Sequence, residues 1–118
     1  MILPHVDVAR FYEDIWSRFD EQAFQELMGV HYPRLEEFRE QIVGRTCVDV
    51  GCGHGAVSGV LAKLGAQRVI SIDLSQGAMR CLRQNARAFP QIVPLRASAL
   101  DLPLARGSAD FVVSNGVV

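Results

Sequence analysis

The sequence predicts an α/β protein organised around a parallel β-sheet, preceded by a helical segment. Four short apolar runs alternate with stretches of helical periodicity between residues 45 and 118, a pattern typical of βαβ units. The runs are almost continuously apolar, as expected of strands in a sheet that is covered on both faces. Residues 1–44 show helical spacing alone, so we expect the sheet to begin after them.

The first 44 residues carry apolar residues at helical spacing in two stretches. They are Val8, Phe11, Ile15 and Phe19, and then Leu35, Phe38 and Ile42. Pro33 stands where the first position of a helix tolerates proline, and Gly44 stands where a helix would stop. We therefore expect the second helix to begin near Pro33 and to end before Gly44.

The sheet strands are expected at the four apolar runs. These are 46–50 (TCVDV), 68–73 (RVISID), 91–96 (QIVPLR) and 109–114 (ADFVVS). Because Pro94 has no N–H to donate to a neighbouring strand, the third strand should lie at an edge of the sheet.

Two helices are expected between these strands. The first buries the stripe Val57, Val60, Leu61 and Leu64 and ends at Gly65, and the second buries Met79, Leu82, Ala86 and Phe89. Ser75 is the expected N-cap of the second helix, since its hydroxyl can accept a hydrogen bond from a free N–H of the first turn.

Length and composition suit one globular domain: 118 residues, 49% of them hydrophobic and 21% charged. The net charge of −1 provides no basic field for nucleic acid or for an anionic membrane. Cys47, Cys52 and Cys81 lack paired spacing, which argues against a disulfide framework and against a metal site. Free thiols and the absence of a signal-peptide pattern favour a cytoplasmic protein, and no apolar run is long enough to span a bilayer.

A glycine-rich turn follows the first strand. Gly51, Gly53 and Gly55 allow a sharp bend and let a ligand approach the main chain, and the N–H groups of the next helix point to the same place. Asp73 ends the second strand 22 residues after Gly51. An acid at that position can accept hydrogen bonds from both hydroxyls of a ribose, although it can also cap the following helix.

Two classes of nucleoside ligand fit this turn. The segment GCGHGA (51–56) matches the dinucleotide pattern GxGxxA. However, Asp49 lies two residues before the turn, where its carboxylate would repel a pyrophosphate and would suit a ligand with positive charge. S-adenosylmethionine carries a sulfonium and an ammonium group and has no phosphate, so we favour it over a nicotinamide or flavin dinucleotide.

Four segments in order resemble class I S-adenosylmethionine-dependent methyltransferases. The stretch VDVGCGHGAVSGVLAKLGAQRVISIDLS resembles their first two strands around the turn D/E-x-G-x-G-x-G, and ASALDLPLARGSADFVVSNGVV resembles their later segment. The resemblance implies a Rossmann-like, doubly wound parallel sheet with strand order 3-2-1-4. FYEDIWSRFDE resembles the helical cap of the small-molecule enzymes, so the implied division is a cap at 1–44 and a cofactor-binding domain at 45–118.

The resemblance also implies roles for individual residues. Asp49 lies near the methionine end of the cofactor, with backbone from Gly51, Cys52 and Gly53 around it, and Gly55 permits close helix packing. Asp73 binds the ribose, and Leu74, Ala99 and Leu100 contact the adenine. Ser98 replaces an aspartate that often binds the adenine amino group, so this bond lacks charge assistance. Asn115 offers its carbonyl to the cofactor's amino group and faces the acceptor.

The predicted reaction is the in-line transfer of a methyl group to a small molecule. The segment SNGV replaces the N/D-P-P-Y motif of amino-directed enzymes, which with the near-neutral charge argues against a nucleic-acid acceptor. No catalytic base is identified. The family's sheet has seven strands and this sequence carries four, so we expect a fragment that associates with itself or with a partner chain along the fourth strand. The alternatives are an NAD-dependent oxidoreductase and a non-catalytic interaction module.

Two aromatic residues allow two interpretations of their role, and several other residues are expected to have no functional role. Tyr12 and Trp16 either close over the cofactor or pack the N-terminal helix onto the domain. His54 is expected to be a solvent-facing loop residue. The arginines on the second helix, at 80, 83 and 87, are expected to form a solvated helix face.

Overall fold

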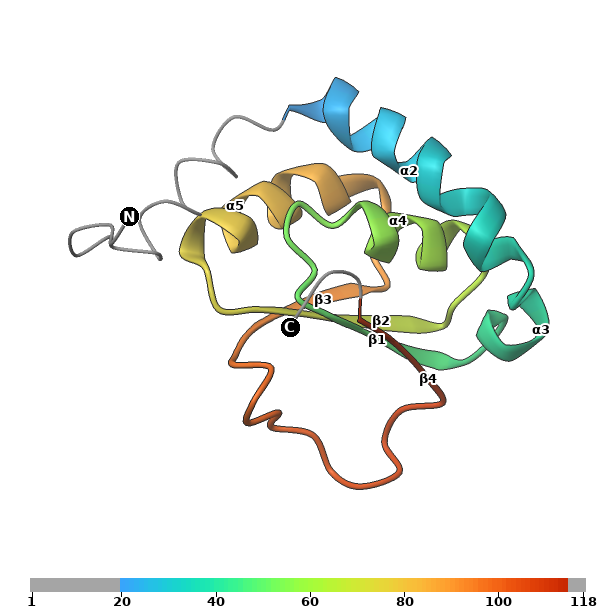
Figure 1. The fold of residues 1–118 in the computed structure, drawn as a ribbon, viewed down its shortest axis with the longest axis vertical. Coiled ribbons are helices and arrows are strands. Elements are labelled where there is room, and N and C mark those ends of the chain that lie inside the picture. Colours follow the sequence, from blue (N-terminus) through green and yellow to red (C-terminus); the bar gives the residue numbers. More distant parts are fainter. Residues whose placement is uncertain (1–19, 115–118) are drawn as a thin grey trace, which may run out of the picture.

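The computed structural model describes residues 20–114 of the chain. Figure 1 shows the order of the elements. The helices are α2 (Glu21–Glu36), α3 (Arg39–Ile42), α4 (Ala56–Lys63) and α5 (Gln76–Asn85), followed by the short helical turn η1 (Ala86–Ala88), and the strands are β1 (Thr46–Val50), β2 (Arg68–Asp73), β3 (Ile92–Arg96) and β4 (Phe111–Ser114).

The four strands form one parallel sheet in the order β3-β2-β1-β4. This confirms the strand order that the resemblance implied, and it places Pro94 on an edge strand, opposite Ser71. The fourth strand begins at Phe111, two residues later than predicted. The Asp110 carboxylate accepts the Thr46 N–H at 3.0 Å, and the Asp110 N–H donates to the Thr46 carbonyl at 2.8 Å, so Asp110 bonds to β1 just before the paired residues begin at Cys47 and Phe111.

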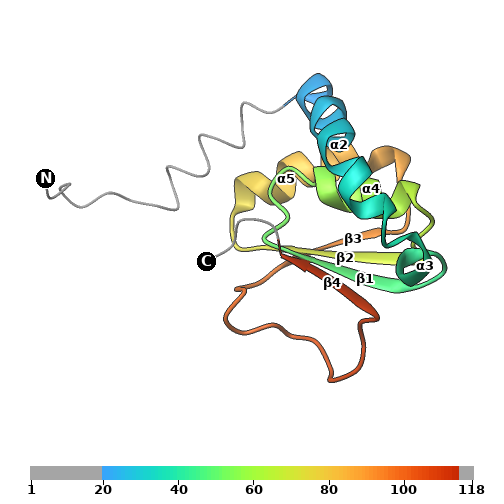
Figure 2. The ribbon, with the colours of Figure 1, turned by 45° about the vertical axis from the view of Figure 1, so that its right-hand side comes forward.

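The two faces of the sheet are covered differently. Helices α4 and α5 lie on one face, with α2 outside α4 on the same side, and the loop 97–110 crosses the other face (Figures 1 and 2). Under the loop, the buried side chains of Val48, Val50 and Ile72 pack against apolar residues that include Leu104. Among the described residues the second face is therefore covered only in part: Val93 and Val112, on the two edge strands of that face, are 44% and 59% exposed.

Helix α2 joins the core through its contact with α4. Its buried side chains Phe24 and Met28 lie against Gly59, where a Cβ atom would be 2.9 Å from Phe24 Cζ and from Met28 Sδ. The absence of a side chain at position 59 therefore lets the two helices approach closely. Residues 24–42 and the sheet contribute to one hydrophobic cluster.

The helix boundaries near Pro33 differ from the prediction. Pro33 does not begin a helix: it lies inside α2, which continues to Glu36. A proline in a helix leaves the carbonyl four residues earlier, here that of Gly29, without its N–H partner. Both residues are exposed, so water can solvate that carbonyl. Gly44 has a φ of 70° just after α3, as expected at a helix end.

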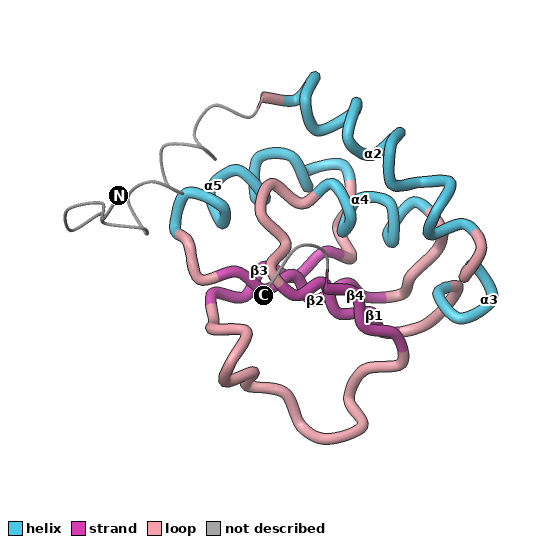
Figure 3. The backbone as a smooth tube through the Cα atoms, viewed as in Figure 1, coloured by secondary structure: helices cyan, strands magenta, loops and turns pink. Residues whose placement is uncertain are grey.

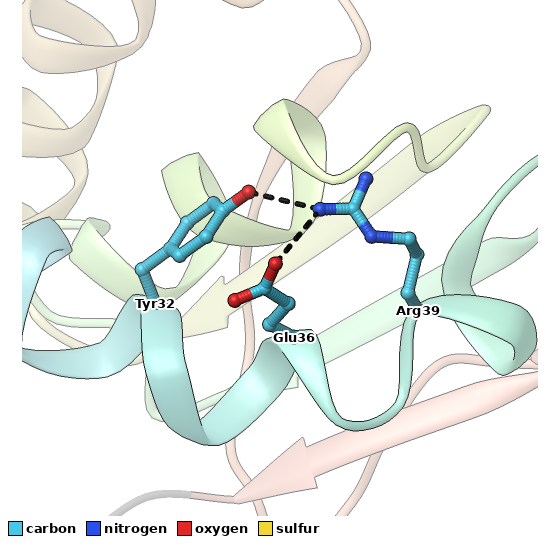
Figure 4. A network of polar contacts seen from close by, with 3 residues as sticks. All are labelled: Tyr32, Glu36 and Arg39. Carbon is cyan, nitrogen blue, oxygen red and sulfur yellow. Dashed lines mark hydrogen bonds and ion pairs between the residues drawn. The ribbon is translucent and has the colours of Figure 1, made fainter.

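A polar network joins the end of α2 to α3 (Figure 4). One Arg39 nitrogen donates to the Tyr32 hydroxyl at 3.0 Å and lies 3.3 Å from a Glu36 carboxylate oxygen. The Lys63 ammonium of α4 lies 5.7 Å from the centre of the Tyr32 ring. Since these groups are solvent-exposed or nearly so, each contact contributes only about 0–1 kcal/mol.

None of the described helices is long and apolar enough to cross a membrane.

Candidate functional site

The candidate site lies at the carboxyl ends of the parallel strands. The connections from β1 to α4 and from β2 to α5 leave the sheet at the same edge, as Figures 1 and 3 show. β2 and β4 flank β1 on opposite sides, so the chain changes direction across the sheet at β1. In open α/β sheets, ligands bind outside the carboxyl ends of the strands at such a switch point.

The glycine turn requires its glycines. Gly51, Gly53 and Gly55 have φ values of 71°, 54° and 92°, a left-handed conformation that side-chain-bearing residues rarely adopt. A Cβ atom on Gly55 would also overlap the Leu82 side chain of α5. The turn is therefore shaped both by its own backbone and by the close approach of α5.

The N–H groups of the turn have partners within the protein. Those of Gly51 and Cys52 both donate to the Ile72 carbonyl, at 2.8 and 2.9 Å. The Gly53 N–H donates to the Asp73 carboxylate at 2.9 Å. Further along, the Gly55 N–H donates to the Cys52 carbonyl at 2.9 Å. The first three of these N–H groups hold the turn against the end of β2 and the fourth bonds within the turn, so none of the four is directed at an external phosphate.

Both carboxylate oxygens of Asp73 accept hydrogen bonds from nearby backbone N–H groups. One oxygen accepts the Gly53 N–H, and the other accepts the Ser75 N–H at 3.0 Å. Ser75 is the N-cap of α5, as predicted, with its hydroxyl accepting from Ala78 at 3.2 Å. Each oxygen of Asp73 retains a second lone pair, so these bonds leave capacity for ribose hydroxyls.

Asp49 lies beneath the turn and faces α4. Its side chain is 1% exposed, and the Ser58 hydroxyl of α4 donates to its carboxylate at 2.7 Å. The Ser58 hydroxyl also lies 2.6 Å from the Ser71 hydroxyl of β2. Burial raises the pKa of Asp49 to about 6, although the hydrogen bonds from Ser58 act in the opposite direction.

Sequence reasoning missed Ser58 and Ser71. Both are fully buried polar residues, in a helix and a strand whose neighbouring positions are apolar. A serine at an otherwise apolar inward position is the signal that would have identified them, because a buried hydroxyl needs a hydrogen-bond partner.

The electrostatic field at the turn disfavours negative charge. The pKa of the Cys52 thiol is raised first by burial and then by the negative charges of Asp49 and Asp73. The contribution of the two carboxylates favours a cation at the same place, whereas burial disfavours a charge of either sign. The turn therefore lies in the combined field of the two acids that the sequence identified.

His54 is not the solvent-facing loop residue that we expected. It is half-buried, and its Nδ1 accepts the Ala56 N–H of α4 at 3.1 Å. Its backbone carbonyl accepts from Asn85 Nδ2 at 3.2 Å. Burial, together with the nearby charge of His31, lowers the pKa of His54 to about 4. The imidazole therefore stabilises the first turn of α4 by accepting the Ala56 N–H, a contact that the sequence pattern could not show.

The segment after β3 lies beside the end of β2. The Ala97 N–H donates to the Asp73 carbonyl at 3.1 Å, and Arg96 Nε donates to the Leu74 carbonyl at 2.8 Å. The Leu74 and Leu100 side chains are 62% and 96% exposed, so apolar surface is open here.

Ser98 and Ala99 belong to the same loop. The Ser98 hydroxyl is half-buried and accepts the Leu100 N–H at 3.1 Å, and Ala99 is exposed. The other implied contacts lie at Asn115, Tyr12 and Trp16, all outside the described residues. Within residues 20–114 no group of histidines, cysteines and acids could hold a metal ion, and the three cysteines are buried and form no disulfide.

Comparison with known families gives a match over more than half of the chain. Residues 48–118 match the family model described as "Methyltransferase domain". Ribosomal protein L11 methyltransferase from Alkaliphilus metalliredigens is 41% identical over 80 residues, which are 64% of this chain and 25% of the relative. The protein of the same name from Thermotoga maritima is 39% identical over 72 residues, 61% of this chain and 27% of the relative. The chain thus spans about a quarter of these relatives.

Solved structures share the fold. A methyltransferase from Mesorhizobium loti, described as S-adenosylmethionine-dependent, is 30% identical, with a TM-score of 0.62 over 71% of this chain and 38% of that one. A protein from Methanococcus maripaludis has a TM-score of 0.74 at 21% identity, over 98% of this chain and 54% of that one. Phosphoethanolamine N-methyltransferase 1 from Haemonchus contortus, solved with S-adenosylhomocysteine, has a TM-score of 0.71 at 21% identity, over 92% of this chain and 24% of that one.

Proposed function

The chain belongs to the methyltransferase domain family of class I S-adenosylmethionine-dependent enzymes, and from this premise we propose that its glycine turn binds S-adenosylmethionine for methyl transfer. The observation that carries the proposal is the charge at the turn. Asp73 accepts the Gly53 N–H of the turn and Asp49 lies beneath it, and two carboxylates at one place favour a cationic ligand there. The chain spans only part of its relatives, and the activity of the whole protein is part of this proposal.

The hydrogen bonds of the turn support this ligand over a dinucleotide. Dinucleotide-binding turns direct backbone N–H groups at a pyrophosphate. Here the N–H groups of Gly51, Cys52 and Gly53 donate to the end of β2. A pyrophosphate would have to displace these bonds and approach two carboxylates, so the NAD-dependent alternative is disfavoured on both grounds.

We propose the following assignment for the cofactor. Asp73 accepts hydrogen bonds from the ribose hydroxyls, and the exposed apolar surface of Leu74 and Leu100 contacts the adenine, with Ala99 alongside. The Ser98 hydroxyl accepts from the adenine amino group, and Asn115 offers its carbonyl to the amino group of the methionine moiety. These contacts would orient the cofactor and exclude water from it, which is how a protein contributes most to such a transfer.

The cofactor supplies a methyl group on a positively charged sulfur, which is an excellent leaving group. The protein then has to place the acceptor atom in line with that methyl group. A hydroxyl or a protonated amine as acceptor would also need a general base. We assign no residue to that role.

The acceptor has two candidates. A small molecule is our first proposal, on the segment SNGV and the net charge of −1. A protein acceptor is the second, because the relatives from Alkaliphilus metalliredigens and Thermotoga maritima are named for a ribosomal protein. Incubation with methyl-labelled S-adenosylmethionine and either purified L11 or a small-molecule extract separates the two by which fraction takes up the label.

Titration calorimetry of the full chain tests the cofactor assignment. We expect saturable binding of S-adenosylhomocysteine and no comparable binding of NAD. Tighter binding of NAD would overturn the assignment. A folded chain that binds neither ligand would instead favour the non-catalytic interaction module.

We also propose that the chain associates along β4. Among the described residues, β4 pairs with β1 on one side only, and the side chain of Val112 is 59% exposed. A strand edge with free backbone groups is a template for pairing with another chain. Sedimentation over a range of protein concentrations tests this: a growing dimer fraction is expected, and a monomer at all concentrations would contradict it.

A further inference from the structure

Three buried polar side chains form a chain of hydrogen bonds beneath the glycine turn. They come from three elements: Asp49 from β1, Ser58 from α4 and Ser71 from β2. The distances are 2.7 Å from Ser58 Oγ to Asp49 Oδ2 and 2.6 Å between the two hydroxyl oxygens. All three side chains are at most 1% exposed, so water does not compete for these bonds.

The hydroxyl pair can satisfy Asp49 in either charge state. When Asp49 is ionised, Ser58 uses its single proton to donate to the carboxylate, so Ser71 must donate to Ser58. When Asp49 is protonated, its O–H can donate to Ser58 Oγ, and Ser58 can then donate to Ser71. Neither arrangement leaves a buried donor or acceptor of the Asp49–Ser58 contact unpaired, and the change requires only rotation of two hydroxyl groups.

The surroundings of Asp49 also leave its charge state finely balanced. Burial and the charge of Asp73 disfavour the carboxylate, whereas the Ser58 hydroxyl and the Ser58 N–H near the start of α4 favour it. Cys52 in the turn is the second titratable neighbour, and its raised pKa keeps it as a neutral thiol. β4 presents Val113 in register with Asp49 and contributes no charge there.

We propose that Ser58 and Ser71 are positioning residues that let Asp49 gain or lose a proton, and that the site thereby adjusts its preference for a cationic ligand over its neutral counterpart. The inference rests on the proposed function, because it concerns the same cofactor site. S-adenosylmethionine has a sulfonium where S-adenosylhomocysteine has a neutral thioether. An ionised Asp49 favours the former over the latter, and protonation of Asp49 removes its contribution to that preference, while the contribution of Asp73 remains.

The test is the ratio of the two dissociation constants as a function of pH. The full chain is titrated with each ligand from pH 5 to pH 8. We expect the preference for S-adenosylmethionine to increase about tenfold as Asp49 ionises, which corresponds to one pK unit of coupling, with a midpoint near the pKa of about 6. Carbon NMR of the Asp49 carboxyl group in the free protein should show the same midpoint without any ligand.

Variants separate this role from a purely structural one. Ser58→Ala removes a donor to the carboxylate, so the midpoint should rise by about one unit. Ser71→Ala should shift it in the same direction by less, and Ser58→Thr should restore it. Ser108→Ala, in the exposed loop, is the control. If Ser58→Ala does not fold, the wild-type and Ser71→Ala titrations still decide the matter.

The outcomes distinguish the two proposals. Binding of both ligands with a ratio that does not change with pH would overturn this inference and leave the cofactor assignment standing. An Asp49 carboxyl resonance that titrates at its ordinary pKa would overturn it too. A folded chain that binds neither ligand at any pH would overturn both.

Discussion

The Asp73 carboxylate accepts a hydrogen bond from the Gly53 N–H at 2.9 Å, which joins the end of β2 to the turn that follows β1. Two more N–H groups of that turn donate to the neighbouring Ile72 carbonyl. The turn is thus held by its own donors, with the Asp73 carboxylate beside it and the buried Asp49 carboxylate beneath it.

The first prediction concerns the charge of Asp73. Asp73→Asn keeps one oxygen that can accept from the backbone but removes the negative charge and half of the acceptor capacity. We expect the affinity for S-adenosylhomocysteine to fall by roughly thirtyfold, since a hydrogen bond to a charged group is worth about 1.5–3 kcal/mol. Calorimetry measures it, and Asp101→Asn in the exposed loop is the control. An unchanged affinity would remove Asp73 from the site.

The second prediction concerns the packing of α5 against Gly55. Gly55→Ala should destabilise the fold by about 1–3 kcal/mol for its left-handed backbone and by about 1–3 kcal/mol more for overlap with Leu82. Gly107 also has a positive φ, 77°, but has open space around it. Gly107→Ala should therefore show the backbone cost alone when both variants are unfolded in urea.

A double-mutant cycle isolates the overlap with Leu82. Because Leu82→Ala removes the atoms that a new Cβ would meet, Gly55→Ala should cost less in that background than in the wild type. Strict additivity of the two free energies would show that the steric contact is not what position 55 requires.

The third prediction concerns the docking of α2 on α4. Gly59→Ala should destabilise the protein by about 1–3 kcal/mol, because the new methyl group meets Phe24 and Met28. Gly29 lies in α2 with no neighbouring atom within 4 Å of an added Cβ. Gly29→Ala should stabilise it by about 1 kcal/mol through helix propensity. Equal effects of both changes on the free energy of unfolding would contradict this account of the contact.

Sequence patterns predicted correctly those elements whose ends are determined by residues close to them in the chain. The bounds of β1 and β2 are those that the apolar runs gave, and Ser75 caps α5 through its own hydroxyl. Pro94 indicated an edge strand because its missing N–H is a property of the residue itself. In each case the determining contact lies within a few residues of the chain or follows from one side chain.

Tertiary contacts determined what the sequence did not predict. α2 continues through Pro33 because Phe24 and Met28 before the proline and Leu35 after it are all buried, which offsets one lost hydrogen bond. His54 is half-buried at the start of α4, and α2 brings His31 close enough to affect its pKa. The partner of Asp49 is Ser58, nine residues away on a helix, and only the packing of α4 on β1 brings the two together.

The last prediction concerns the pH dependence of stability, where Asp49 and His54 act in opposite directions. The native pKa of Asp49, about 6, lies above its ordinary value of 3.8. The native state therefore binds more protons there, and this contribution falls as the pH rises from 4 to 6. The native pKa of His54, about 4, lies below 6.5, so its contribution rises with pH between 4 and 6.5. In the wild type, these two changes of stability with pH have opposite signs and offset each other.

Replacing either side chain should leave the pH dependence of the free energy of unfolding that is due to the other. Relative to the wild type, Asp49→Asn should gain stability as the pH rises from 4 to 6, because the decline due to Asp49 is gone. His54→Asn keeps an acceptor for the Ala56 N–H and should lose stability over the same interval. Urea unfolding at several pH values measures both differences, and groups common to the proteins cancel. A difference curve that stays flat would mean that the side chain removed in that variant titrates in the native state near its ordinary pKa, and that its burial does not control its charge.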